Sequence, residues 1–479
     1  MHLTAEYFPY ARTGGLAEAV MGLASFQQAS GLPATVLLPL YRTVHDEAPD
    51  LEPVGPPIRV PLGSRVEEAR IFRIAGSAAQ SGPRVFFIEH LDFFNRAGIY
   101  GEQGRDYPDN ARRFAFFALA ACLALPRVAS GPLILHAHDW HTALAPIYLR
   151  TVVAREPWAR DALAILSVHN PGYQGHFGPE AMLDLGLPVE LYNWHQLEWY
   201  GKVNFLKGGL AFADCAITVS PTQAIELCTP GGGFGLHDMY QALGDRLVGI
   251  VNGIDQTVWD PATDPQILAR YGVQDLAGKQ RCKAALQRSY GLPENPATPL
   301  FGMAGRLVQQ KGLDLILESR QLLQEDAQFV FLGSGDPRYE EALAGLARAA
   351  PGRIGVQLAF RDPLEHRLMA GVDLFLMPSL YEPCGLTQMR AQRYGSLPVA
   401  RRVGGLADTI EDGVTGFLFD AYEATALEEA AFRALSLYGR PADRTRMMRE
   451  AMARDFSWER SVSAYIDVYR RVVARGPRA

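Results

Sequence analysis

The sequence predicts an α/β protein built from two Rossmann-like, doubly wound domains. Three observations lead to this prediction: the length of the chain, a repeated alternation of strand-like and helix-like segments, and an Arg-x-Gly-Gly-Leu-Ala motif that occurs once in each half. With 479 residues, of which 48% are hydrophobic, the chain exceeds what one hydrophobic core usually holds. Two domains are therefore expected.

Short apolar runs recur along the chain, and their lack of polar alternation is typical of buried parallel strands. The ten runs are, in order, ATVLLP (34–39), RVFFIE (84–89), PLILHAHD (132–139), ALAILSVHN (162–170), CAITVS (215–220), PLFGMAG (299–305), FVFLGSG (329–335), IGVQLAF (354–360), VDLFLMPS (372–379) and LPVARR (397–402). Segments with helical spacing lie between them, at 15–30, 110–125, 312–323 and 339–349. Each half is therefore expected to form a parallel sheet with helices between its strands.

The boundary between the domains is predicted at LVGIVNGID, where a strand ends in Asn-Gly. This gives an N-terminal domain at 1–246 and a C-terminal domain at 247–455. Residues 260–284 are expected to form a polar connection into the second half. The amphipathic segment WERSVSAYIDVYRRVVAR is expected to form a helix that packs back on the first domain, so that 456–479 belongs to it.

Composition disfavours several classes of partner. Lysine and arginine number 46 against 52 acidic residues, without a basic tract, so bulk charge does not favour nucleic acid. The five cysteines are scattered and form no CxxC pair, which argues against a disulfide framework and a cysteine zinc site and favours a reducing, cytoplasmic location. No window approaches ~18 uninterrupted apolar residues, so no membrane span is expected.

A motif of the form Arg-x-Gly-Gly-Leu-Ala-acid occurs as RTGGLAEAV (12–20) and again as RVGGLADTI (402–410). Paired glycines before a helix let backbone N–H groups approach an anion or a hydroxyl, and the helix start adds partial positive charge. A tight turn without a ligand explains either copy alone about equally well. Because open α/β sheets bind ligands beyond the carboxyl ends of their strands, the two copies together suggest a deep cleft shared by the domains.

Arg306 and Lys311 follow a predicted strand in AGRLVQQKG. A planar two-pronged donor and a compact ammonium together suit a departing diphosphate. A solvated basic pair is the alternative, but a helix start is mildly unfavourable for cations unless an anion binds there. The anion site is therefore the preferred interpretation.

Glu382 lies in YEPCGLTQ, between a hydrophobic strand and a helix-like segment. That helix is expected to add uncharged donors for the same phosphates through its first N–H groups, which belong to Leu386, Thr387 and Gln388.

Other nucleotide-binding motifs do not fit: there is no GxxxxGK[ST], and GSGDPR (333–338) lacks the third glycine of a dinucleotide fingerprint. In HAHDWH (136–141), His136 and His138 share a strand face, which permits a metal site. The lining of a polar ligand pocket is the preferred interpretation. SVHNPGYQG places His169 at the end of the next strand, in the same layer.

These residues resemble the glycogen and starch synthases of bacteria and plastids, which are retaining glucosyltransferases of the GT-B architecture. The resemblance covers nearly the whole chain in order, through RTGGLAEAV, HAHDWH, SVHNPGYQG, ITVSPT, VNGID, GRLVQQKG, FLGSGDP, EPCGLTQ, GGLADT and FSW. It implies a nucleoside-diphosphate glucose as donor, most often ADP-glucose in bacteria, and the nonreducing end of an α-1,4-glucan as acceptor. No metal or organic cofactor is implied.

The resemblance also implies roles for single residues. The catalytic candidates are Glu382 against the donor glucose, Arg306 and Lys311 on its diphosphate, and His169 and Asp139 around the sugar. The remaining donor-binding candidates are Arg12, Gly14, Gly15, Trp140, Asn252, Phe360, Cys384, Gly385, Leu386 and Thr387. Phe360 stands where relatives often carry a tyrosine against adenine, so stacking is kept and a hydroxyl is lost. The segment DFFNRAGIYG resembles the acceptor-side loop.

Two positions depart from the family motif KTGGLAD: Arg12 replaces lysine and Glu18 replaces aspartate. Charge is kept, but arginine is bulkier and differently hydrated, which leaves the choice between ADP-glucose and UDP-glucose open. Retention by double displacement needs a second carboxylate ~5 Å from the first. The donor motif offers no convincing candidate, and the position eight residues after Glu382 is Arg390. Front-face transfer is therefore predicted.

Two other classes of protein stay open. A glucan phosphorylase would share the architecture but needs pyridoxal phosphate on a lysine. A catalytically silent glucan-binding protein is compatible with the departures at Arg12 and Glu18.

Overall fold

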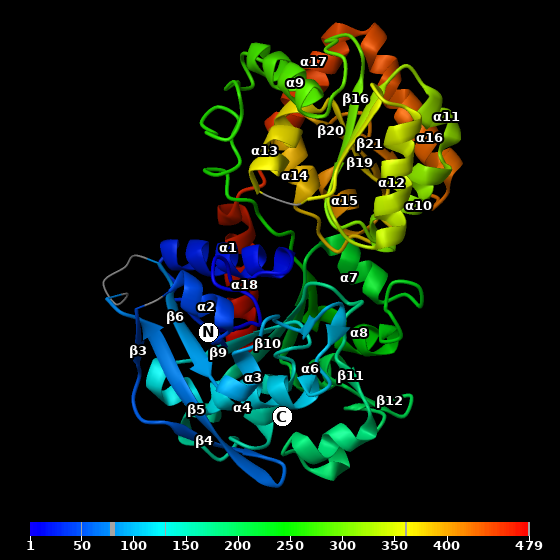
Figure 1. The fold of residues 1–479 in the computed structure, drawn as a ribbon. Coiled ribbons are helices and arrows are strands. Elements are labelled where there is room, and N and C mark those ends of the chain that lie inside the picture. Colours follow the sequence, from blue (N-terminus) through cyan, green and yellow to red (C-terminus); the bar gives the residue numbers. More distant parts are fainter. Residues whose placement is uncertain (49, 77–81, 130, 360–361, 478–479) are drawn as a thin grey trace. The chain divides into compact units, whose positions relative to one another are not determined.

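The computed structural model describes residues 1–48, 50–76, 82–129, 131–359 and 362–477. It divides into two compact units (Figure 1). Unit 1 consists of Met1–Asn252 together with Trp458–Ala479, and unit 2 is Gly253–Ser457. Unit 1 therefore takes residues from both ends of the chain.

Unit 1 is built on a large twisted sheet in the order β15-β14-β10-β9-β1-β2-β6-β5-β3, with β4 paired to β5. Strands β15 to β6 in that order are parallel, whereas β5 pairs antiparallel with β6, β3 and β4. The strands of this unit are β1 His2–Leu3, β2 Thr35–Pro39, β3 Leu51–Pro53, β4 Ile58–Leu62, β5 Arg65–Ile74, β6 Arg84–Glu89, β7 Gly101–Glu102, β8 Arg105–Asp106, β9 Ile134–His138, β10 Leu163–Val168, β11 His176–Phe177, β12 Glu198–Trp199, β13 Lys202–Asn204, β14 Cys215–Thr218 and β15 Leu247–Gly249.

Helices cover both faces of this sheet. The helices of unit 1 are α1 Gly15–Ala29, α2 Arg42–Glu47, α3 Leu91–Phe94, α4 Asn110–Val128, α5 Leu144–Arg150, α6 Phe205–Phe212, α7 Pro221–Leu227, α8 His237–Leu243 and α18 Trp458–Arg475. Apolar side chains of α4, α5 and α6 belong to the main core. A second apolar cluster joins α1 and α18 to β10 and β14.

The last helix packs directly on the first one, as Figure 1 shows for α18 in red and α1 in blue. Gly22 of α1 makes this contact possible, because a Cβ there would lie 2.2 Å from the Trp458 ring. The Trp458 side chain is 3% exposed. The amphipathic pattern of α18 thus buries its apolar stripe in unit 1.

Unit 2 contains a parallel six-stranded sheet in the order β18-β17-β16-β19-β20-β21. Its strands are β16 Leu300–Ala304, β17 Gln328–Leu332, β18 Ile354–Gln357, β19 Leu374–Met377, β20 Leu397–Arg401 and β21 Phe417–Phe419. Its helices are α9 Ala277–Ser289, α10 Leu313–Glu318, α11 Arg320–Gln324, α12 Pro337–Ala349, α13 Asp362–Gly371, α14 Thr387–Arg393, α15 Gly404–Thr409, α16 Ala424–Leu435 and α17 Pro441–Met452. Figure 1 shows α12 and α13 on opposite sides of the sheet, which is the doubly wound arrangement.

All ten apolar runs contain a strand of these two sheets. One predicted helix and one predicted connection need correction. The segment 312–323 forms two helices, which meet at Ser319, where ψ is 68° and not helical. The buried Ser319 hydroxyl donates to the Leu315 carbonyl at this turn, at 2.7 Å. The predicted connection 260–284 is not wholly irregular, since α9 begins at Ala277 and buries Lys279 and Cys282.

Candidate functional site

Glu382 of unit 2 lies in the loop between β19 and α14 and is 5% exposed. Its Oε2 accepts from Lys311 Nζ at 2.6 Å and from the Ser379 hydroxyl at 3.1 Å. A buried carboxylate needs such partners, because burial without them is costly. Within the described ranges Glu382 Oε1 has no hydrogen-bond partner. One oxygen is thus held by the protein, and the other is available to a ligand.

The segment that carries Arg306 and Lys311 is tied to the Glu382 loop through Gln310. The Leu380 N–H donates to the Gln310 carbonyl at 2.8 Å, and Gln310 Nε2 donates to the Tyr381 carbonyl at 3.3 Å. The Arg306 side chain is exposed, and its contact to Gln310 Oε1 is long, at 3.5 Å. Arg306 therefore keeps most of its donors available.

Gly312 sets the path of this segment and is expected to be intolerant of a side chain. Its φ is +73°, and a Cβ there would lie 1.9 Å from the Pro378 carbonyl oxygen. A Gly312→Ala substitution should lower stability by about 1–3 kcal/mol, because it adds a clash with backbone to a left-handed conformation.

Urea denaturation of the two proteins measures this difference. Gly345→Ala in α12 is the matched control, since its Cβ would approach only an Arg348 side-chain nitrogen, at 3.9 Å. The control should gain about 0.5–1 kcal/mol. Equal denaturation midpoints for both variants would contradict the close approach at Gly312.

The two Gly-Gly motifs have different surroundings. In unit 2, the Gly405 N–H donates to the Glu382 carbonyl at 3.0 Å, and a Cβ would lie 2.0 Å from the Cys384 carbonyl oxygen. Packing against the Glu382 loop therefore explains this copy. In unit 1, a Cβ on Gly14 or Gly15 would meet nothing within 4 Å, so internal crowding does not explain that copy.

Glu6, which belongs to none of the sequence motifs, holds the turn before α1. Its Oε2 accepts from the backbone N–H of Thr13 at 2.7 Å and of Gly14 at 3.1 Å. Its Oε1 accepts from the Thr13 and Tyr100 hydroxyls, both at 2.6 Å. Burial and the Glu6 charge raise the pKa of Tyr100 well above its usual value, so Tyr100 remains a donor. Tyr100 lies in DFFNRAGIYG, so this segment is anchored to the turn.

The two departures from the family motif contact each other. Arg12 Nη2 lies 3.1 Å from Glu18 Oε1, and both side chains are about a quarter exposed. Arginine and glutamate, each with a longer side chain than the lysine and aspartate of the family motif, thus form an ion pair across the start of α1. The pairing of Arg12 with Glu18 keeps the local charge balanced.

Asp139 and His169 lie at the ends of neighbouring parallel strands, β9 and β10. Asp139 has a φ of +58°, which is uncommon for a residue with a side chain, and its Oδ1 accepts from the His169 N–H at 2.7 Å. Burial raises the pKa of Asp139 to about 7 and lowers that of His169 to about 4. Asp139 therefore fixes the backbone that carries His169, whose ring is partly exposed.

The other predicted donor-binding residues differ in exposure. Trp140 is 9% exposed and packs against Phe114, with ring centroids 5.1 Å apart, as part of the unit 1 core. Asn252 is 6% exposed, and its buried Oδ1 has no hydrogen-bond partner in the described structure. Phe360 lies outside the described residues.

Gln388 supports the loop that contains Cys384, Gly385, Leu386 and Thr387. Its Nε2 donates to the carbonyls of Cys384 at 3.0 Å and Gly385 at 2.9 Å. Gly385 has a φ of +71°. The helix that follows, α14, has only seven residues.

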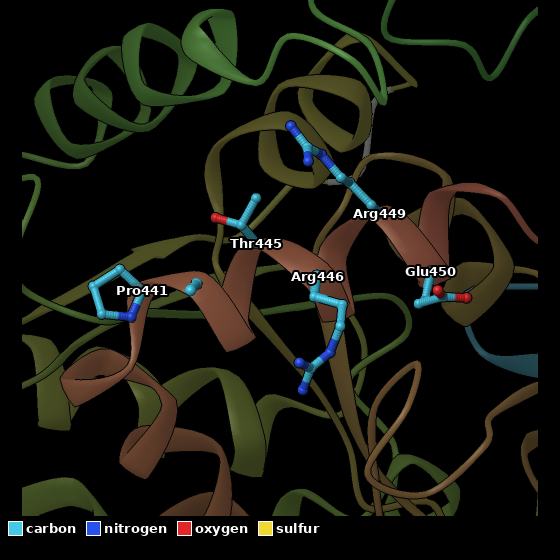
Figure 2. A pocket seen from close by; sticks show the side chains of 6 residues that line it. Pro441, Thr445, Arg446, Arg449 and Glu450 are labelled. Atoms are coloured by element: carbon cyan, nitrogen blue, oxygen red, sulfur yellow. The ribbon is translucent and has the colours of Figure 1, made fainter.

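A separate hollow lies on α17, as Figure 2 shows, and is lined by side chains of that helix alone. Arg446 forms an ion pair with Asp443 at 2.8 Å, and Arg449 donates to the Val273 carbonyl at 3.0 Å. None of the predicted site residues lines this hollow.

Comparison with known proteins identifies relatives of both halves of the chain. Residues 1–242 match the starch synthase catalytic domain, and residues 287–454 match the glycosyl transferases group 1. The catalytic domain of starch synthase IV from Arabidopsis thaliana bound to ADP and acarbose is 34% identical, with a TM-score of 0.88 over 99% of both chains. A sucrose-phosphate synthase from Thermosynechococcus elongatus has a TM-score of 0.61 at 17% identity over 99% of this chain and 98% of its own, which shows the fold alone.

The fold and these matches define the protein as a glycosyltransferase of the GT-B architecture, and so as an enzyme that transfers hexosyl groups. A glycogen synthase from Anaeromyxobacter dehalogenans is 43% identical over 478 residues, which is 98% of each chain. Glycogen synthase 2 from Geobacter sulfurreducens is 40% identical over 475 residues, 98% of this chain and 97% of its own. The chain belongs to the glycogen and starch synthase family.

No helix in the described parts of the chain is both long and apolar enough to cross a bilayer.

Proposed function

We propose that this chain transfers glucose from ADP-glucose to the 4-hydroxyl at the nonreducing end of an α-1,4-glucan, with retention of the anomeric configuration, and so elongates glycogen. The observation that carries the proposal is the buried Glu382, with one oxygen bound by Lys311 and Ser379 and the other available. The catalytic domain of a starch synthase of similar structure is bound to ADP and acarbose, which supports an ADP-linked donor for this chain.

The unit 2 residues would receive the nucleotide end of the donor. Arg306 is exposed and has most of its donors available, which suits two-pronged contacts to phosphate. Lys311 carries its charge within 2.6 Å of Glu382 and would share it between this acid and the diphosphate. As the C1–O bond lengthens, negative charge grows on the phosphate and positive charge on the sugar ring. Cations on one side and a carboxylate on the other stabilise that separation.

Transfer would take place on one face of the sugar. The bond between C1 and the phosphate oxygen breaks, the acceptor 4-hydroxyl attacks C1 on the same face, and its proton passes to the departing phosphate oxygen. Arg390, eight residues after Glu382, donates to Glu365 at 3.1 Å and lies over Trp259, so it is held by other groups. An arginine at this position supplies no second carboxylate, and we therefore propose a route without a glycosyl-enzyme.

His169 and Asp139 would serve the sugar from unit 1. The partly exposed His169 ring would contact a glucose hydroxyl, and Asp139 would hold the His169 backbone through the 2.7 Å bond. We place the reaction in the cytoplasm, because none of the five cysteines forms a disulfide in the described structure.

The test is a transfer assay with glycogen and either ADP-glucose or UDP-glucose. Nucleotide release and chain extension are measured together, and the anomeric configuration of the new bond is read by NMR. The proposal expects stoichiometric extension with ADP-glucose and new α-1,4 bonds. Nucleotide release without extension, or β-linked product, would refute it.

The same assay separates the alternatives. Faster turnover with UDP-glucose would reassign the donor while keeping the reaction. Glucose 1-phosphate formed from glycogen and inorganic phosphate, together with the absorption of pyridoxal phosphate, would identify a phosphorylase. Glycogen binding without turnover of either donor would identify a silent binding protein.

A further inference from the structure

Three buried histidine side chains lie against one another on one face of the unit 1 sheet. His2 on β1 pairs in register with His136 on β9, and His138 follows on the same face. The His136 and His138 rings stack at 4.4 Å, and those of His2 and His138 at 5.3 Å. All three side chains are at most 1% exposed.

A nitrogen of each ring lies within 4.8 Å of the others, which is the spacing of a metal site. Every ring nitrogen, however, already has a hydrogen-bond partner. His136 contacts the Tyr469 hydroxyl at 2.9 Å and the Ser167 hydroxyl at 2.7 Å. A metal ion would have to displace such bonds in a sealed interior, so hydrogen bonding explains the cluster better than coordination.

His2 and His138, the other two histidines, belong to a continuous series of hydrogen bonds that begins at Gln27 and ends at His169. Gln27 Oε1 contacts His2 Nε2 at 3.0 Å, and His2 Nδ1 contacts His138 Nε2 at 3.0 Å. His138 Nδ1 then contacts His169 Nε2 at 2.9 Å. We call Gln27, His2, His138 and His169 the histidine chain.

The first link sets the direction of every proton in the histidine chain. Gln27 Nε2 donates to the Pro33 carbonyl at 3.3 Å, so its Oε1 faces His2. An amide oxygen can only accept, and His2 Nε2 must therefore carry a hydrogen. Because a neutral imidazole carries one hydrogen, His2 Nδ1 is an acceptor and His138 Nε2 must donate to it.

The same rule applies to the next link. His138 Nδ1 is left as an acceptor, so His169 Nε2 must donate to it. His169 Nδ1 then holds a lone pair, and the structure gives this atom no hydrogen-bond partner among the described residues.

The rings are neutral at physiological pH. Burial lowers the pKa of His2 to about 3 and that of His169 to about 4, and it lowers the pKa of His138 well below the usual value. A charged ring would donate from both nitrogens, so the hydrogen bonds on its two sides could no longer run in the same direction.

We propose that Gln27, His2 and His138 are positioning residues that hold His169 in the tautomer with hydrogen on Nε2, so that Nδ1 accepts a hydrogen bond from a donor-sugar hydroxyl. The second half of this statement rests on the role given to His169 under the proposed function. The histidine chain extends across three parallel strands to α1. Through it, Gln27, which is remote in sequence, determines which hydrogen-bonding groups His169 can bind.

Nitrogen NMR of protein labelled with ¹⁵N-histidine tests the tautomer without substrate. The His169 signals are identified by their loss in His169→Asn. The wild-type ring should show protonated Nε2 and unprotonated Nδ1. Hydrogen on Nδ1 would overturn the proposal without any further variant.

Matched variants test the cause. Gln27→Leu and His2→Phe break the histidine chain and should leave His169 in a mixture of both tautomers. Gln28→Leu removes a glutamine from the same helix, one that accepts from the Ala34 N–H at 2.9 Å, and His136→Phe removes a ring from the same stack. Both lie outside the histidine chain and should leave the tautomer unchanged. An unchanged tautomer in Gln27→Leu, or a mixture in His136→Phe, would refute the relay.

Kinetics then test the consequence. If the two tautomers become equally populated, the competent form is halved, and KM for the donor should rise by about twofold or more in Gln27→Leu, with kcat much less affected. Gln28→Leu should keep the parent KM. A changed tautomer with an unchanged KM would overturn the role in donor binding. Because the NMR result needs no substrate, failure of the histidine chain and failure of the proposed reaction are distinguishable.

Discussion

A Glu382→Gln variant is expected to lose about 100- to 1,000-fold in kcat, because it removes a negative charge aimed at the positive charge that develops on the sugar. The glutamine keeps the size of the side chain and can still accept from Lys311 and Ser379, so the loop should stay folded. ADP affinity should remain close to that of the parent, since the nucleotide is bound by other groups. Initial rates with ADP-glucose and calorimetry with ADP measure the two effects.

Glu428→Gln is the matched control. Glu428 is another buried glutamate of unit 2, 7% exposed, and its Oε1 accepts from the Gln321 N–H at 2.9 Å. The kcat of Glu428→Gln should stay near the parent value. Near-normal turnover in Glu382→Gln, or a comparable loss in Glu428→Gln, would remove Glu382 from the proposed mechanism.

Substitution of either cation, Arg306 or Lys311, is expected to weaken ADP binding. Only the Lys311 substitution is expected to lower the stability of the protein as well. Arg306→Ala should reduce ADP affinity by about 10- to 100-fold, the usual value of hydrogen bonds to a charged group. Its denaturation midpoint should not change, because Arg306 is exposed and only loosely bonded. Lys311→Met should weaken ADP binding as well, and it should also lower the midpoint, because it leaves the buried Glu382 without its cation.

Calorimetric titration with ADP and urea denaturation provide both measurements. Arg320→Ala, at an exposed arginine in α11, controls for the general loss of positive charge in unit 2. ADP affinity that falls equally in Arg320→Ala would show that Arg306 acts only through bulk charge. A parent-like midpoint in Lys311→Met would mean that the ion pair with Glu382 contributes little.

Buried parallel strands were predictable because both of their faces must be apolar, as in VDLFLMPS around β19. The antiparallel strand β5 escaped detection, since its sequence RVEEARIFRI mixes charged residues with apolar ones and only two of its ten residues are buried. The break between α10 and α11 comes at Ser319, where the backbone leaves the helical region and the hydroxyl bonds back to Leu315. Helical spacing carries no information about such a bond.

In the candidate site, too, single motifs could be predicted from the sequence, whereas the contacts between them could not. Motifs around Glu382 and Lys311 could be recognised, but the contact between them joins residues 71 positions apart and follows from the order of the sheet strands. The part played by Glu6 could not be inferred, because an acid at that place is unremarkable until the turn before α1 folds over it. Likewise, the link between His2 and His138 depends on the register of β1 against β9.

The route of the chain has a consequence for biosynthesis. Because α18 covers part of the unit 1 sheet, and Trp458 fills the space that Gly22 leaves, the side of α1 that carries Ala19 and Leu23 stays uncovered while residues 253–457 emerge from the ribosome. The first half of the protein can reach its final packing only after translation of the last helix. Deletion of α18 should therefore leave α1, near the N-terminus, incompletely packed and make the truncated protein prone to aggregation.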